Sequence, residues 1–132
     1  MRLTSTILGI AFALGAIPAF AAGAYLNDLL KQPAYLASWN ALFAGAAAPD
    51  WVAAFAATSN GVATPSEDVT IGGTTYTYAG LCQPHDCGDN KLGVLFSADG
   101  ASAWAMLSEG GTTRLYGNPD AAVAAALKAK TE

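Results

Sequence analysis

The spacing of apolar residues along the chain changes from a helical period to an alternating one and then back again. In the first half, apolar residues recur every three or four positions, which is the spacing of one helix face. This spacing predicts three helices, over residues 25–31, 35–43 and 51–58. From residue 68, apolar and β-branched residues alternate, which predicts five strands, over residues 68–71, 74–78, 92–96, 103–107 and 113–116. A last helix is expected over residues 119–130.

Turn and capping residues separate these predicted elements. Gly72-Gly73 is typical of a two-residue hairpin turn between the first two strands. Asp50 is placed to cap the third helix and Asn118 to cap the last, with Pro119 at its first position. Helices, then consecutive strands, then one more helix indicate an α+β domain, with a central five-stranded antiparallel sheet flanked by helices.

The first 21 residues have the pattern of a secretory signal peptide. A positive start and a largely apolar run precede Ala19-Phe20-Ala21, which matches a small-x-small cleavage site. The apolar run is shorter than the ~20 residues that a membrane-spanning helix needs. We therefore expect export to the periplasm, removal of residues 1–21, and a single domain over residues 22–132 with no membrane segment.

Charge and composition narrow the classes of function. Residues 22–132 contain five basic and ten acidic side chains, which gives a net charge of −5. An acidic domain of this kind argues against nucleic-acid binding and suits a basic partner. The chain has one histidine and no glycine-rich loop followed by Lys-Ser or Lys-Thr, so a hydrolytic triad and nucleotide chemistry have no support. We expect neither enzymatic activity nor a cofactor.

The two cysteines and the single histidine of the chain lie within one six-residue segment, Cys82-Gln83-Pro84-His85-Asp86-Cys87. If the cysteines pair, they close a tight ring, and Pro84 fixes one backbone dihedral just before His85. A disulfide in a small exported domain is often only a stabilising cross-link, which would give His85 no particular role. A ring this small instead favours local shaping, and it would present His85 from a rigid loop at a hairpin tip. Two Cys and one His leave a zinc site one ligand short, so no metal is expected.

This segment and the sequence after it resemble the Ivy family, the inhibitors of vertebrate (c-type) lysozyme. The family's loop motif is Cys-Lys-Pro-His-Asp-Cys, and the chain departs from it only at Gln83, where Lys is usual. Residues 92–99 (LGVLFSAD) and 116–119 (YGNP) extend the resemblance, which covers most of the chain from about residue 25. The resemblance implies a disulfide-closed loop that enters the cleft of c-type lysozyme, where His85 meets the catalytic carboxylates.

Two hypotheses of different classes follow. The first is a periplasmic inhibitor of c-type lysozyme that uses the 82–87 loop. The second is a non-inhibitory periplasmic binding module that presents the same loop to lytic transglycosylases or to cell-wall glycan. Loss of inhibition on replacing His85, or on reducing the disulfide, would distinguish the first from glycan binding. Some members of the family are dimers, so the resemblance also admits a homodimer.

Overall fold

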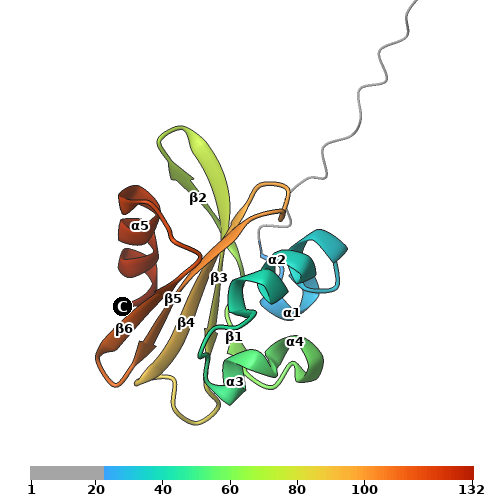
Figure 1. The fold of residues 1–132 in the computed structure, drawn as a ribbon, viewed down its shortest axis with the longest axis vertical. Coiled ribbons are helices and arrows are strands. Elements are labelled where there is room, and N and C mark those ends of the chain that lie inside the picture. The colour runs from blue at the N-terminus through green and yellow to red at the C-terminus, as the bar shows by residue number, and fades with distance from the viewer. Residues whose placement is uncertain (1–22) are drawn as a thin grey trace, which may run out of the picture.

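A computed structural model describes residues 23–132, so the expected signal peptide lies outside the described residues. In this part of the chain the strands form one antiparallel sheet with helices against both faces (Figure 1). The strands are β1 Val62–Ala63, β2 Glu67–Ile71, β3 Thr74–Cys82, β4 Asn90–Ser97, β5 Ala103–Glu109 and β6 Thr112–Tyr116. They lie in the order β1-β3-β4-β5-β6, and β2 also pairs with β3.

The helices are divided unequally between the two faces of the sheet. They are α1 Leu26–Leu29, α2 Pro33–Phe43, α3 Asp50–Ala53, α4 Phe55–Thr58 and α5 Ala121–Thr131. The N-terminal helices α1 to α4 lie on one side of the sheet and the C-terminal helix α5 on the other (Figure 1). None of these helices is long and apolar enough to cross a membrane. The predicted α+β class is confirmed, and β1 adds a sixth strand that is too short to show an alternating pattern.

Neighbouring residues of a central strand pack against different helices. On β4, Val94 and Phe96 belong to the core beneath α1–α4, whereas Leu95 belongs to the smaller core beneath α5. The buried members of that smaller core are Tyr78, Leu95, Met106, Val123 and Leu127. A strand buried on both faces needs an almost continuous apolar run. This explains why β4 carries the Leu-Gly-Val-Leu-Phe sequence rather than a strict alternation.

The structure corrects both predicted helix caps. Asp120, not Asn118, caps α5, and its carboxylate accepts a 2.8 Å hydrogen bond from the Val123 N–H. Asn118 has a φ of 50°, whereas a capping residue needs an extended backbone so that its side chain can turn back to the helix. At the third predicted helix, Pro49 occupies the cap position and Asp50 is the first helical residue. This helix is also divided at Ala54 into α3 and α4.

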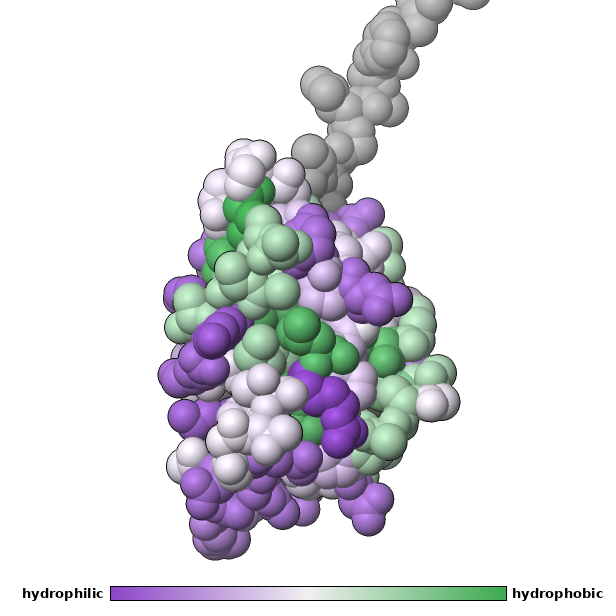
Figure 2. Space-filling view, turned by 60° about the vertical axis from the view of Figure 1, so that its left-hand side comes forward, coloured by the Kyte–Doolittle hydropathy of each residue, from purple (hydrophilic) through white to green (hydrophobic). Residues whose placement is uncertain are grey.

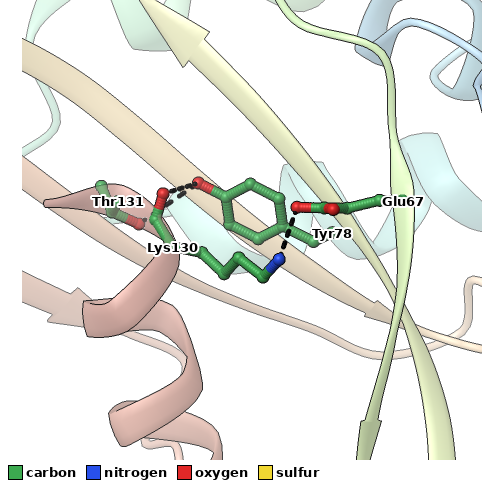
Figure 3. Close-up of polar contacts among 4 residues, drawn as sticks. All are labelled: Glu67, Tyr78, Lys130 and Thr131. Carbon is green, nitrogen blue, oxygen red and sulfur yellow. Dashed lines mark hydrogen bonds and ion pairs between the residues drawn. The ribbon is translucent and has the colours of Figure 1, made fainter.

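Polar contacts fasten the end of α5 to the sheet (Figure 3). The Tyr78 hydroxyl on β3 donates to the Lys130 carbonyl at 3.2 Å and lies 3.4 Å from the Thr131 hydroxyl. The Lys130 ammonium forms a 2.8 Å ion pair with Glu67 on β2. These contacts hold the helix across the strands that lead into the cysteine segment.

Candidate functional site

The cysteine segment forms the connection between β3 and β4, the two central strands of the sheet. Cys82 is the last residue of β3, and its disulfide to Cys87 brings their Cα atoms to 5.0 Å. Strand pairing continues to the base of the ring, because Cys82 lies opposite Lys91 of β4. The expectation of a disulfide-closed loop at the tip of a hairpin is therefore confirmed.

A single tight turn places His85 at the outer end of the ring. The Asp86 N–H donates to the Gln83 carbonyl at 3.1 Å, which closes a four-residue turn with Pro84 at its second position. Pro84 excludes the mirror-image turns, because its φ is fixed near about −65°. His85 has a φ of 66°, which excludes type I and leaves type II.

The imidazole of His85 has no polar partner within the described residues of the free protein. The residue is exposed, and no residue between 23 and 132 forms a hydrogen bond or ion pair with its side chain. The left-handed backbone at this position costs a residue other than glycine roughly 1–2 kcal/mol. Histidine adopts the left-handed conformation more readily than most residues do, but glycine would adopt it without strain. The conformation alone therefore does not explain why a histidine stands here.

Asn90, the first residue of β4, is a loop contact that the sequence reasoning missed. Its side-chain amide donates to the Gln83 amide oxygen at 2.9 Å and to the Asp86 carboxylate at 2.7 Å. Asn90 follows the ring and belongs to no motif, so no local sequence signal marks it as a loop contact. The hydrogen bond that the Asp86 carboxylate accepts thus comes from Asn90 and not from the neighbouring imidazole of His85.

Acidic side chains surround the ring. The Gly110 N–H in the β5–β6 turn donates to the Asp89 carbonyl at 2.9 Å, so this turn lies against the β3–β4 loop. Glu109 lies opposite Asn90 in the sheet register. Figure 2 shows hydrophilic residues gathered at the lower end of the molecule, where both turns lie in Figure 1. Among residues 23–132, three acidic residues (Asp86, Asp89 and Glu109) and one basic residue, Lys91, therefore lie in or next to the two turns at this end of the sheet.

A hollow of about 350 Å³ lies beside the ring, on the side of the sheet that faces α5. Both cysteines form part of its wall, and the contacts between Tyr78 and the end of α5 border it. Among residues 23–132 no group of three or more His, Cys, Asp or Glu side chains is placed to hold a metal ion. The arrangement presents an exposed histidine on a disulfide-closed loop.

Comparison with known proteins identifies the family. A family model described as inhibitor of vertebrate lysozyme (Ivy) matches residues 34–132. The chain belongs to the Ivy family. It is 39% identical over 82 residues to the inhibitor of vertebrate lysozyme from Pseudomonas aeruginosa, an alignment that covers 61% of this chain and 51% of that protein.

Two further relatives have similar levels of identity to the chain. The chain is 33% identical over 72 residues to the inhibitor of vertebrate lysozyme from Escherichia coli K12, covering 54% of this chain and 43% of that protein. It is 37% identical over 82 residues to an uncharacterized protein from Yersinia pestis, with 61% and 51% covered. The chain spans about half the length of the curated relatives it matches.

The one departure from the Ivy loop motif has a visible structural consequence. Gln83 stands where the motif has Lys, and its side-chain oxygen accepts the hydrogen bond from Asn90. A lysine ammonium has only donors and could not accept this bond. In this chain the second residue of the ring is therefore tied to β4, in a way that the usual lysine does not allow.

Proposed function

We propose that this protein inhibits c-type lysozyme by inserting the Cys82–Cys87 loop, with His85 at its tip, into the catalytic cleft. Membership of the Ivy family and the names of its relatives support the choice of partner. The observation that carries the proposal is the exposed His85 at the apex of a type II turn, inside a disulfide ring. The strained backbone at a histidine, rather than a glycine, is explained if the imidazole is what the partner binds.

The chemistry of lysozyme gives the imidazole a defined task. The enzyme works with one protonated and one ionised carboxyl group on either side of the scissile bond. A charged imidazole has two N–H donors on different sides of its ring, so it can donate to both carboxyl groups at once. Hydrogen bonds between an imidazolium and a carboxylate are charge-assisted and stronger than neutral ones. Inserted there, His85 would occupy the position of the substrate and engage both catalytic groups.

The rest of the loop would lower the cost of binding and speed the encounter. The disulfide and the turn fix the backbone before binding, so little conformational entropy is lost when the loop enters a cleft. The carboxylates of Asp86, Asp89 and Glu109 lie around the ring, and residues 22–132 carry a net charge of −5. This charge would attract a basic lysozyme over long range and would do so less effectively at high salt.

The proposed site of action is the periplasm, after removal of residues 1–21 as a signal peptide. The disulfide between Cys82 and Cys87 supports this location, because such bonds persist in oxidising compartments. Expression of the full sequence in a Gram-negative host, followed by periplasmic extraction and N-terminal sequencing, tests it. We expect a mature protein that begins at Ala22, and an uncleaved cytoplasmic protein would refute the assignment.

The test of inhibition uses two replacements that keep the turn. Asparagine and glycine both adopt a positive φ readily, so His85→Asn and His85→Gly remove the imidazole without straining the loop. Alanine is a poorer choice, because its own strain at this position would be mixed with the loss of the side chain. Lysis of bacterial walls by hen or human lysozyme is measured with each oxidised protein. We expect the wild-type protein to protect the walls and both variants to lose at least about tenfold in inhibitory potency.

A matched control lies at the opposite end of the sheet. Thr74 begins β3 at the β2–β3 hairpin and is exposed, so Thr74→Ala should inhibit as well as the wild-type protein. Full inhibition by His85→Asn would show that the imidazole is not the inhibitory group. Absence of inhibition by the wild-type protein would refute lysozyme as the partner and direct the search to lytic transglycosylases and wall glycan.

A further inference from the structure

The side chain of Asn90 joins two residues of the ring to the first residue of a central strand. Its Nδ2 lies 2.9 Å from the Gln83 Oε1 and 2.7 Å from the Asp86 Oδ2. The backbone adds two hydrogen bonds between the same residues. The Gln83 N–H donates to the Asn90 carbonyl at 3.1 Å, and the Asn90 N–H donates to the Asp86 carbonyl at 3.0 Å. Both ends of the turn that carries His85 are therefore fixed to β4.

These contacts are independent of the disulfide. The disulfide joins Cys82 and Cys87, which lie outside the turn on either side. The amide of Asn90 reaches Gln83 and Asp86, the first and last residues of the turn itself. Opening the disulfide leaves every one of these hydrogen-bonding groups in the chain, and loss of the amide leaves the ring closed. The loop thus has two separate constraints around the same strained residue.

We propose that Asn90 is a positioning residue of the inhibitory loop, and that its amide keeps His85 presented for binding when the disulfide is open, so that reducing the disulfide alone does not abolish inhibition, contrary to the expectation drawn from the sequence. This inference rests on the proposed function. Gln83 takes part in this positioning, since its side-chain oxygen is one of the two acceptors for the Asn90 amide. The substitution of Gln for the usual Lys thereby exchanges a loop cation for an additional hydrogen bond between the loop and Asn90.

Two constraints on one loop give a characteristic pattern of losses. Binding weakens in inverse proportion to the fraction of molecules whose loop is already in the binding conformation. If the disulfide or the Asn90 amide is enough to keep nearly all molecules in the binding conformation, removing the other one changes affinity little. Removing both allows the fraction to fall, so the combined loss exceeds the product of the single losses. If the two constraints acted independently of each other, the fold losses in affinity would multiply.

The experiment compares four oxidised or disulfide-free proteins. They are the wild-type protein, Asn90→Ala, the pair Cys82→Ser with Cys87→Ser, and the combination of all three changes. Lysozyme affinity is measured for each by calorimetry, and the exchange rates of the Asp86 and Asn90 amide protons are measured in the free proteins by NMR. We expect each partial variant to lose less than about tenfold in affinity and the combination to lose more than their product. Exchange at both amides should accelerate most in the combination.

Conservative replacements separate positioning from a general loss of stability. In the disulfide-free protein, Gln83→Glu keeps the acceptor oxygen and should keep the amide protection, whereas Gln83→Met has a similar length and should lose it. Asp89→Ala changes an exposed side chain next to Asn90 and should leave the exchange rates unchanged. Losses that multiply, or amide exchange that is unaffected by Asn90→Ala in the disulfide-free protein, would overturn the positioning role. Because the exchange rates are measured without lysozyme, they decide this role even if the wild-type protein does not bind lysozyme.

Discussion

Replacing Gly93 with alanine should destabilise the protein at the point where α5 is fastened to the sheet. Gly93 lies on β4 opposite Gly80 of β3. A Cβ atom added to Gly93 would overlap the Thr131 hydroxyl oxygen and lie 2.7 Å from the Tyr78 hydroxyl oxygen. Both hydroxyls would have to move away, and the Tyr78 hydrogen bond to the Lys130 carbonyl would be lost with them (Figure 3).

The expected cost follows from the groups that must move. Each lost hydrogen bond is worth about 1 kcal/mol net, and overpacking in a filled interior costs about 1–3 kcal/mol. Alanine recovers a little less than about 1 kcal/mol of backbone entropy relative to glycine. We therefore expect the free energy of unfolding to fall by about 1–3 kcal/mol, measured by urea denaturation followed by tryptophan fluorescence.

Two further variants make the reasoning refutable. Gly88→Ala is the matched control, because a Cβ added there would meet no atom within 4 Å and should leave stability nearly unchanged. Removing the hydroxyl that obstructs the new Cβ, with Thr131→Ala, should make Gly93→Ala less costly than it is in the wild-type background. A change of less than about 0.5 kcal/mol for Gly93→Ala alone would contradict the close packing described here.

Three other predictions concern the cap, alkaline stability and binding. Asp120→Ala should lower the free energy of unfolding by about 1 kcal/mol, whereas Asn118→Gly, which suits the positive φ at that position, should lose no helix cap, and urea denaturation compares the two; equal losses would contradict the cap assignment. Burial raises the pKa of Tyr78, so its contribution to stability is complete below pH 10 and lost as pH rises through the raised value. Denaturation between pH 8 and 11.5 should therefore show a shallower decline for Tyr78→Phe, and parallel declines would refute this. Affinity for lysozyme should fall as salt concentration rises, because the net charge of −5 on residues 22–132 attracts a basic partner, and an affinity by calorimetry that does not change with salt would contradict this attraction.

Features set by local spacing were predictable from the sequence. The short apolar run over residues 92–96 is typical of a strand buried on both faces, so this strand could be predicted, and in the structure Leu95 lies in one core and Val94 and Phe96 in the other. The ring at the hairpin tip was equally accessible, because its two cysteines are close in sequence and lie between two predicted strands. These predictions succeeded because each depends on residues that are neighbours in the chain.

Two kinds of feature were not predictable: the choice between two residues that are equally suited to a position, and contacts that depend on the backbone path of a loop. Asn118 and Asp120 are both good capping residues, and only the backbone conformation decided between them. Pro84 is compatible with type I and type II turns, so the left-handed backbone of His85 could not be read from the sequence. The contacts of Asn90 depend on how the seven residues before it fold back, which no local pattern specifies.

The central claim is that the loop occupies the catalytic cleft of lysozyme, and competition tests it most directly. Affinity of the oxidised wild-type protein for lysozyme is measured by calorimetry, without and with an N-acetylglucosamine oligosaccharide that fills the cleft. At an oligosaccharide concentration about ten times its dissociation constant, mutually exclusive binding weakens the apparent affinity about tenfold. We expect that reduction, with a further proportional loss at higher concentration. An unchanged affinity would mean that the protein binds lysozyme outside the cleft and would contradict the account.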